Sequence, residues 1–371
     1  MSPYPTNLRS DTSPPPRLAV ERVLLYQPET DWTYSHHASI TWFKGRYYAI
    51  WSNGREHEDS YGQRVLVAKS EDFAHWTAPE PLINSLPGTQ GELVLTAAGF
   101  HQHEGTLVAY AGQYEFDKAD THLRALTSTD GDTWSDLLDL GVPVCPNHPP
   151  QAVIRGRDGD AGRLFARATR LVIAGNIAFP YTDDPCGLTG WTNTGIYPPG
   201  QSGEDNPETF WGIQVEQGWP VPLCEGSFYQ MPDGCLRMLL RVTGPEPPGV
   251  LWLTESRDDG ATWSSPVETP FTNMDHKFHF GRLPDGRFFY VGTPYPGSRC
   301  PLVICLSRDG DLFDEHYIIA DEPYERKRAG RAKGGQYGYP HTLVHEGHLC
   351  LIVSRQKEAM EVMRFPLTEL R

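Results

Sequence analysis

The chain has 371 residues, of which 39% are hydrophobic and 21% charged, with 36 Gly and 33 Pro. This composition is typical of a folded, turn-rich protein and excludes a disordered one. The formal net charge of −15 argues against nucleic acid or an anionic membrane as the main partner, because both favour clustered lysine and arginine. An anionic sugar in a local basic pocket remains compatible with it.

Residues 1–18 are rich in Pro, Ser and Thr, and we expect them to form a flexible segment before a single domain at 19–371. The opening stretch has no apolar core of a secretory signal, which favours a cytoplasmic protein, or a secreted one if a leader has been removed. No apolar run is long enough to cross a membrane. The seven cysteines have no C-x-x-C pair, so neither a disulfide framework nor a zinc knuckle is expected.

Hairpins of alternating hydrophobicity with Gly-containing turns recur along the chain. They cover residues 38–52, 97–113, 226–242, 277–294 and 341–355. Further β-rich runs, such as RVLVAKS and VLWLTES, follow them, so four-stranded units recur at a spacing of roughly 50 to 60 residues. This repetition predicts an all-β protein, a β-propeller with four-stranded antiparallel blades.

Short turn motifs after these runs support the propeller. Residues 256–263 read SRDDGATW, which matches the Asp-box S-x-D-x-G-x-T-W, and looser copies start at Ser70, Thr127 and Ser307. In such a turn the carboxylate and hydroxyl cap backbone N–H groups. The aspartates Asp130, Asp258 and Asp309 are therefore expected to be structural.

Six units can be counted directly from the sequence. The longer stretch from Asn147 to Cys224 could hide a seventh blade or a long loop. We expect the C-terminal run AMEVMRFPL to be completed by the N-terminal ERVLLY in one shared blade, which would close the ring and remove exposed strand edges.

Polar residues gather where inner strands begin and in the loops between the second and third strands, which converge on a propeller's axis. The inner-strand positions are His36, His37, Asn147, His148, Glu225, His276, Lys277, His279, Tyr339 and His341. The loop positions are Asn53, Arg55, His57, Gln113, Tyr114, His122, Tyr181, Asp183, Arg241, Arg355 and Lys357. A single histidine is usually structural, but histidines at equivalent positions of five blades favour a functional or metal-binding role.

Four of these histidines form a candidate metal site. Neutral imidazole binds zinc, and nearby oxygens suit calcium. A structural divalent cation could therefore sit among His37, His148, His279 and His341, although no motif fixes the ligands and the pattern requires no cofactor.

Three chemistries compete for the pocket. Hydrolysis by two carboxylates would use Glu225 and Asp183, which pair weakly. A sialidase would need an arginine triad and a Tyr/Glu nucleophile, and the Phe-Arg-Ile-Pro signature of that family is absent. β-Elimination on a uronic acid uses cationic or amide groups to neutralise the carboxylate and a His or Tyr to take the proton. The excess of His, Tyr, Arg and Asn matches this third chemistry best.

Several phrases resemble one family of propeller enzymes. They are residues 33–82, NHPPQ at 147–151, residues 171–185, residues 224–241 and residues 339–367. They look like the enzymes that remove L-rhamnose linked α-1,4 to D-glucuronate from arabinogalactan and gum arabic. The resemblance implies a seven-bladed propeller and a lyase that gives free rhamnose and a 4,5-unsaturated glucuronate. Some relatives are hydrolases, so an exo-α-L-rhamnosidase is the main alternative, and a non-catalytic sugar-binding propeller is the third.

For the lyase we expect His148 or His122 to transfer the proton, with Tyr181 or Tyr339 as its partner. Arg241, Arg355 and Asn147 would bind the uronate carboxylate. The remaining substrate-binding candidates are His36, His37, Asn53, Arg55, Glu225, His276, His279, His341 and Lys357.

Overall fold

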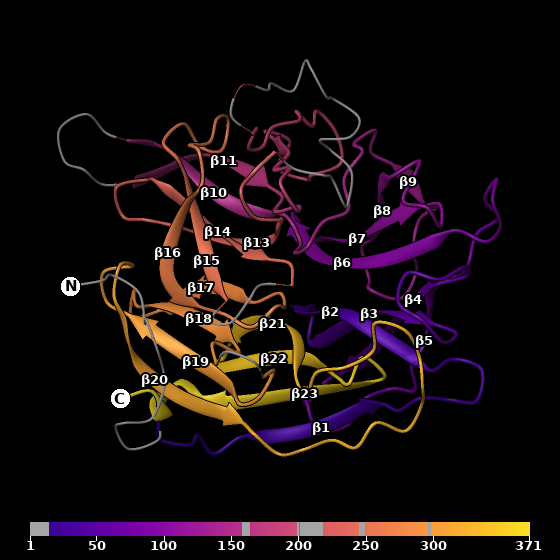
Figure 1. Ribbon diagram of the computed structural model, residues 1–371. Helices are drawn as coiled ribbons and strands as arrows, with labels where there is room; N and C mark the ends of the chain where they lie inside the picture. Colours follow the sequence, from indigo (N-terminus) through magenta and orange to yellow (C-terminus); the bar gives the residue numbers. More distant parts are fainter. Residues whose placement is uncertain (1–14, 158–163, 199, 201–217, 245–248, 296–297) are drawn as a thin grey trace.

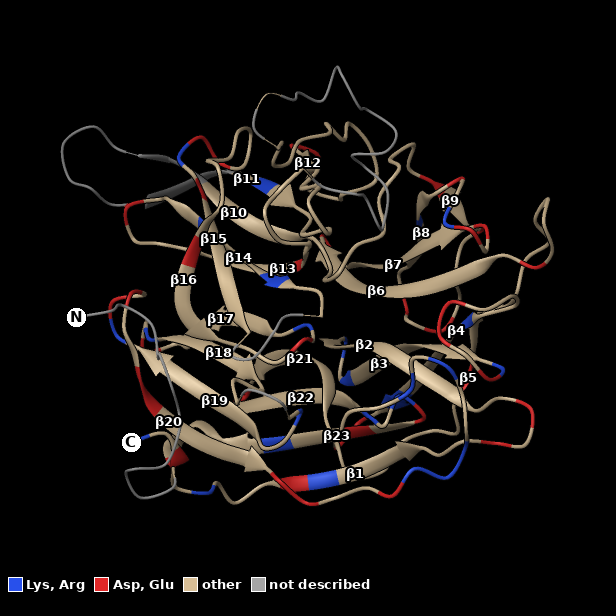
Figure 2. Ribbon diagram, in the orientation of Figure 1, with Lys and Arg blue, Asp and Glu red and all other residues tan. Residues whose placement is uncertain are grey.

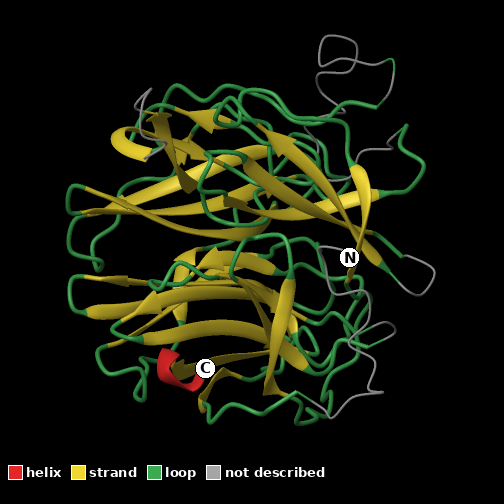
Figure 3. Ribbon diagram, turned by 90° about the vertical axis from the view of Figure 1, so that its left-hand side faces the viewer, coloured by secondary structure: helices red, strands yellow, loops and turns green. Residues whose placement is uncertain are grey.

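The computed structural model describes residues 15–157, 164–198, 200, 218–244, 249–295 and 298–371. Within these ranges the chain forms twenty-three β-strands and one 3-10 turn, η1 (Leu367–Glu369). Strands and loops make up the whole of the described chain apart from this turn (Figure 3). Among these residues, no helix is of a length and apolarity that would span a bilayer.

The strands form six antiparallel sheets, in each of which neighbouring strands are hydrogen-bonded in the order named. The first comprises β2 (Tyr34–Phe43), β3 (Arg46–Gly54), β4 (Arg64–Ser70) and β5 (Glu80–Ile83). The second comprises β6 (Val94–His103), β7 (Thr106–Tyr114), β8 (His122–Ser128) and β9 (Leu138–Asp139). The third comprises β10 (Gln151–Arg157), β11 (Leu164–Val172) and β12 (Tyr181–Thr182).

The other three sheets follow in chain order. The fourth comprises β13 (Leu223–Gln230), β14 (Leu236–Val242), β15 (Val250–Ser256) and β16 (Val267–Thr272). The fifth comprises β17 (His279–Arg282), β18 (Phe288–Gly292), β19 (Leu302–Ser307) and β20 (Phe313–Ala320). The sixth comprises β21 (Gly338–His345), β22 (His348–Arg355), β23 (Ala359–Pro366) and β1 (Glu21–Tyr26).

The sheets succeed one another around a central axis, as Figure 1 shows, which confirms the predicted β-propeller. The sixth sheet combines both ends of the chain, because β1 pairs with β23 in the register Glu21 opposite Arg364. This pairing confirms the expected closure of the ring. It leaves no unpaired sheet edge where the N-terminal and C-terminal strands meet.

The segment between Asn147 and Cys224 contributes only the three-stranded third sheet to the described part of the chain. The seventh blade expected there does not appear among the described residues. Residues 199 and 201–217 of this segment lie outside them, so the count of seven stays a prediction.

The core lies between neighbouring sheets, which explains why the middle strands are apolar on both faces. In β4, every residue after Arg64 is buried, a pattern that a strand with one wet face would not show. Ile40 and Trp51 of the first sheet pack with Ile352 of the sixth. Fully burying such a side chain stabilises the fold by about 1.5–3 kcal/mol.

The Asp-box turns have the structural role expected of them. In the full match, the Ser256 hydroxyl accepts the Gly260 N–H at 2.8 Å and Asp258 accepts the Thr262 N–H at 2.8 Å. Asp130 and Asp309 likewise each accept the N–H groups of the residues two and three positions further along the chain. These bonds end the third strand of a blade and leave the boxes far from any shared pocket.

The N-terminal segment packs against the propeller from an earlier residue than expected. Leu18 N–H donates to Ile318 of β20 at 3.0 Å, and Ile318 N–H donates to Pro16 at 2.9 Å. Leu18 is buried in the core beside β20. The segment expected to be flexible at 1–18 therefore pairs with the fifth sheet from residue 16, and residues 1–14 lie outside the described ones.

Charged residues lie mainly in loops and on outer strands such as β1 and β20, whereas the inner strand β6 is almost free of them (Figure 2). The charges that do reach the central cavity come mainly from the loops between strands and from strand ends. This arrangement sets apart the residues that form the site.

Candidate functional site

One cavity of about 400 Å³ is lined by residues from all six sheets and their connections. Its lining residues are His37, Glu58, Asp59, Thr96, Tyr114, Cys145, Pro146, Asn147, Asn176, Cys224, Glu225, Arg241, Thr243, Asp275, Lys277, Arg299, Ala332, Tyr339 and Lys357. A cavity to which every blade contributes lies about the common axis, where a propeller binds its ligand.

Irregular backbone brings three key side chains into this cavity. The pairing of β2 shifts register between His36 and Ser39, and His37 has a φ of 54°. The pairing of β21 shifts next to Tyr339, which has a φ of 52°, and the pairing of β13 shifts next to Glu225. Bulges of this kind re-aim side chains and are common beside active sites. A non-glycine residue at positive φ costs on the order of 1–3 kcal/mol, so the fold maintains strain at this site.

Tyr339 and Glu225 form the centre of the cavity. The Tyr339 hydroxyl donates to Glu225 Oε2 at 2.6 Å, and Arg241 Nε donates to the same oxygen at 2.6 Å. Burial alone would raise the pKa of Glu225, but Arg241, Lys277 and the Tyr339 hydrogen bond outweigh it and lower that pKa to about 2. Burial and the Glu225 charge raise the pKa of Tyr339 well above its usual value. The pair is therefore a neutral phenol held against an ionised carboxylate.

Cationic side chains lie close to the Tyr339–Glu225 pair. Arg241 also hydrogen-bonds Asp275, and Arg299 donates to the Asp275 carbonyl. Lys277 donates to the Asn147 carbonyl, and burial lowers its pKa to about 8. Arg241, Arg299 and Lys277 thus present positive charge to one wall, which suits a carboxylate-bearing ligand.

Two further carboxylates, Glu58 and Asp59, also line the cavity. Asp59 accepts from the Tyr114 hydroxyl at 2.6 Å and pairs with Lys118. Burial opposes ionisation of Asp59, but Lys118 and His37 outweigh it and lower its pKa. Glu58 accepts from Lys357 Nζ at 2.6 and 2.8 Å.

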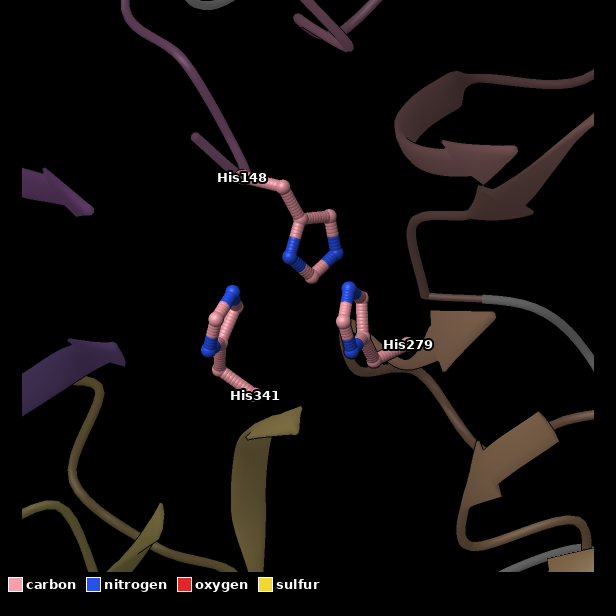
Figure 4. A group of neighbouring side chains, drawn as sticks. All are labelled: His148, His279 and His341. Carbon is pink, nitrogen blue, oxygen red and sulfur yellow. The ribbon is translucent and has the colours of Figure 1, made fainter. Parts of the chain in front are cut away.

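Three of the predicted metal ligands form a separate cluster on the axis. The rings of His148, His279 and His341 come from three different elements and face one another, as Figure 4 shows, with one nitrogen from each within 4.8 Å of the others. None of the three lines the cavity. His37, the fourth predicted ligand, lies instead beside His36 and Glu58, in a second group of the same kind.

Backbone partners fix the tautomers of this axial cluster. His148 Nε2 contacts the Phe278 carbonyl at 2.8 Å and must carry the proton, which leaves Nδ1 as an unpaired acceptor. The Nδ1 atoms of His279 and His341 accept backbone N–H groups from Thr342 and Ile40, at 3.1 and 3.3 Å. Burial lowers the pKa of all three histidines, to about 3 for His279, so each ring is neutral. The two rings that accept backbone N–H groups therefore carry protons on Nε2.

The structure places several other predicted residues in the cavity. Five candidates named from inner-strand or loop positions line it together with Lys277 and Tyr114: His37, Asn147, Glu225, Arg241 and Tyr339. Lys357 also lines it, and His36 lies directly behind His37, with its ring 3.9 Å from that of Tyr339. Of the two tyrosines considered for catalysis, Tyr339 is thus the one at the cavity.

The remaining candidates lie elsewhere in the described structure. His122 forms ion pairs with Asp120 and Asp139, and Tyr181 lies under the Arg170 guanidinium, which also binds Asp183. Arg55 is exposed over Trp32, and Arg355 is buried against Glu361. Four further candidates make hydrogen bonds outside the cavity. Asn53 donates to the Tyr34 carbonyl, and the ring of His276 contacts the Thr293 hydroxyl. Gln113 accepts from Arg124, and His57 accepts the Arg331 N–H. These contacts are structural, and they do not support the pocket roles expected for the residues.

Four charged residues of the cavity are absent from the set expected from the sequence: Glu58, Asp59, Asp275 and Arg299. Glu58 and Asp59 follow the candidate His57 in the same loop, and the two adjacent acids were the available signal. Arg299 lies in the equivalent loop of the fifth sheet, between β18 and β19. A search of that loop position in every blade would have found it.

A family model for the BNR repeat-like domain matches residues 45–351. A sialidase structure superposes with a TM-score of 0.64 and 18% identity, covering 99% of this chain and 34% of its own, so the chain spans about a third of that protein. The intramolecular trans-sialidase from Ruminococcus gnavus gives 0.58 at 14% identity, covering 93% of this chain and 97% of its own.

A protein of unknown function from Dyadobacter fermentans gives a TM-score of 0.63 at 15% identity, covering 93% of this chain and 99% of its own. No curated protein sequence matches the chain. Identities this low establish the fold only. On the family match, the chain belongs to the BNR repeat-like domain family, with a β-propeller fold similar to that of sialidases.

Proposed function

We propose that the protein is a glycoside hydrolase that removes a terminal, carboxylate-bearing sugar, with Tyr339 as its nucleophile. The observation that carries the proposal is the 2.6 Å hydrogen bond from Tyr339 to Glu225, inside a cavity lined by Arg241, Arg299 and Lys277. Sialidases are the glycosidases that use a tyrosine nucleophile, and solved sialidases share this fold.

Each part of the constellation has a chemical role in this reaction. Glu225 takes the hydroxyl proton of Tyr339 as the phenolic oxygen bonds to the anomeric carbon, and the leaving oxygen departs as an anion that takes its proton from water. Glu225 returns its proton to the Tyr339 oxygen when the bond between this oxygen and the sugar is broken in the second step. The cationic wall binds the sugar carboxylate. A neutral phenol approaches such a sugar without the like-charge repulsion that a carboxylate nucleophile would meet. Water then releases the sugar from Tyr339, and the ionised Asp59 is placed to accept its proton.

The site differs from the arrangement expected of a sialidase. Two arginines, Arg241 and Arg299, line the cavity with two lysines instead of an arginine triad. The carboxylate of the substrate is therefore the fixed requirement of the proposal, and its sugar is either a sialic acid or a uronic acid.

A second candidate is the β-elimination expected from the resemblance, at the rhamnose-capped glucuronate of arabinogalactan. The observation that favours it is His37, whose pKa burial lowers to about 3, so that it offers a neutral imidazole on the cavity wall beside Tyr339. The cationic wall would neutralise the uronate, and His37 or Tyr339 would take the C5 proton. His148 and His122, the bases expected from the sequence, do not reach the cavity.

The experiment compares an aryl sialoside, an aryl β-glucuronide and gum arabic with the same enzyme preparation and with Tyr339→Phe. Release of the aryl group that is lost in Tyr339→Phe supports the hydrolase. Rhamnose released from gum arabic with rising ultraviolet absorbance of an unsaturated uronate would instead establish the lyase, and rhamnose without it an exo-α-L-rhamnosidase. No product from any substrate, with measurable binding of one, would leave a sugar-binding propeller.

A further inference from the structure

We propose that His36, His37 and Glu58 form a binding site for a zinc-class divalent cation on the wall of the cavity. Glu58 Oε1 lies 3.9 Å from His36 Nε2 and 4.0 Å from His37 Nε2. Two imidazoles and one carboxylate, with an open position toward a cavity, are the ligands of catalytic zinc sites. The proposed hydrolysis assigns no role to this group, so the inference goes beyond it.

The hydrogen bonds of His36 leave the correct nitrogen free. His36 Nδ1 lies 2.7 Å from the Ser354 hydroxyl, which itself donates to the Gly338 carbonyl. When Ser354 donates to Gly338, its hydroxyl accepts from His36, so Nδ1 carries the proton and Nε2 presents its lone pair. This Nε2 is fully buried and has no partner among the described residues. Metal-bound histidines donate their second N–H to an oxygen in this way.

The bulge in β2 supplies the second imidazole. Consecutive residues of a regular strand point to opposite faces, but the register shift and the positive φ of His37 place both rings on one side, with centroids 4.7 Å apart. His37 Nδ1 lies 3.2 Å from the Ser52 hydroxyl, which can accept its N–H. The strained backbone thus allows two adjacent histidines to face the same ion.

Glu58 can offer an oxygen to a metal in exchange for one of its present contacts. Lys357 contacts both of its oxygens, and the Tyr34 hydroxyl donates to Oε1 at 3.1 Å. A carboxylate has about four lone-pair positions, two on each oxygen, so an ion on Oε1 would take the position of the Tyr34 hydrogen bond, the longer of the two contacts to that oxygen. Lys357, Arg299 and Lys277 oppose a dication beside His36, and the negative charges of Glu58 and Asp59 act against them.

The distances fit an ion with small side-chain adjustments. Ligands about 2.1 Å from a tetrahedral zinc lie roughly 3.4 Å from one another, so the two histidine–carboxylate pairs, now 3.9 and 4.0 Å apart, would each close by roughly 0.5 Å. His37 and Glu58 line the cavity, so the fourth position of the ion faces it. A sugar hydroxyl or a water molecule could bind there, within reach of Tyr339.

The axial cluster lacks this capacity despite its three histidines. His279 and His341 each use the Nδ1 lone pair to accept a backbone N–H, so their inward nitrogens carry protons. A metal would need two fixed backbone donors to lose their acceptors. Two N–H donors and the free Nδ1 of His148 match a water molecule better, since a water molecule can accept two hydrogen bonds and donate one to this set.

The test is zinc binding to the full chain, measured by calorimetry and by metal content after chelator treatment and reloading with Zn²⁺ alone. His37→Asn removes an imidazole while keeping a residue that tolerates positive φ, and Glu58→Gln removes the charge. His279→Gln is the matched control in the axial cluster. We expect one zinc per wild-type chain, a loss of affinity of at least about 10-fold in the first two variants and no loss in the control.

Two results would overturn the inference: no zinc bound by the wild-type chain, or zinc binding that His37→Asn leaves intact. Binding lost only in His279→Gln would assign the ion to the axis instead. A Co²⁺ spectrum without thiolate bands excludes binding by the seven cysteines, which are all free. No sugar is present in the measurement, so its failure leaves the proposed hydrolase untouched.

Discussion

The two histidine clusters of this propeller contain the same side chain in similar burial, yet they are suited to different tasks. In the axial cluster, the acceptor nitrogens of His279 and His341 accept hydrogen bonds from backbone N–H groups. In the cavity cluster, His36 donates to a serine and keeps a free acceptor beside Glu58. The partner of the second ring nitrogen therefore determines which group of histidines can bind a cation and which one supports the fold.

Backbone conformation also distinguishes the two clusters. His37 and its neighbour Tyr339 both have positive φ at register shifts, whereas His148, His279 and His341 do not have positive φ. Strain of this kind persists only where the surrounding structure holds it, and it concentrates at functional sites. The cavity side is thus expected to carry chemistry and the axial side stability.

The largest expected effect tests the chemical side. Tyr339→Phe removes the nucleophile but keeps the ring, and Glu225 keeps its bond to Arg241. We expect kcat/KM to fall by about 10³-fold or more, measured on the substrate that the aryl-glycoside and gum arabic assays identify. His279→Gln in the axial cluster should lower activity far less. Equal losses in both variants would break the division between the two regions.

The second effect tests the stabilising side. His341→Ala leaves the buried Ile40 N–H without an acceptor and a cavity where the ring was, so the free energy of unfolding should fall by about 2–4 kcal/mol. His37→Asn, at a strained position, should change it by less than about 1 kcal/mol. Denaturant unfolding of the two variants measures both values, and a larger loss in His37→Asn would contradict the assignment.

Repetition made the fold predictable. The Asp-box SRDDGATW and the recurring hairpins identify blades because each repeat buries the same apolar faces and ends in the same turn. Even the shared last blade followed from the apolar runs at 21–26 and 359–367. The segment after Asn147 was harder, because its single three-stranded sheet breaks the period.

The site was only partly predictable from the sequence. Side chains alternate between the two faces of a regular strand, and this alternation is interrupted at the bulges that form the site. Sequence position placed His37, Glu225, Arg241 and Tyr339 near the axis, and they line the cavity. It placed His148 in the same pocket, but His148 contacts the Phe278 carbonyl and lies in the cluster with His279 and His341, outside the cavity lining. The Tyr339–Glu225 bond joins residues 114 positions apart, and no local pattern reveals such a pair.

Acid sensitivity gives the third test. Burial lowers the pKa of His279 to about 3, below the value near 6.5 of an unfolded histidine. The unfolded chain then binds the extra proton, so the stability due to neutral His279 is present above about pH 6.5 and is lost as the pH falls toward 3. His279→Gln should reduce the slope of unfolding free energy against pH by up to about 1.4 kcal/mol per unit in this range.

Unfolding in chelator at several pH values between 7 and 4 measures that slope. His148→Gln, in the same cluster, should reduce it as well, because burial also lowers the pKa of His148. A slope that neither variant changes would mean that the axial rings take up protons in the folded protein as readily as in the unfolded chain, and the hydrogen-bond assignment of the cluster would be wrong.

The smallest expected effect sharpens the comparison most directly, because it changes one hydroxyl in each cluster. Ser354 Oγ accepts from His36 at 2.7 Å, and Thr342 Oγ1 lies 2.7 Å from His279 Nδ1. Ser354→Ala removes the group that orients His36 and should lower zinc affinity about 10-fold. Thr342→Val keeps the backbone N–H that His279 needs and should leave zinc affinity unchanged. If titration calorimetry shows the reverse order, the second ring nitrogen does not decide which cluster binds the cation.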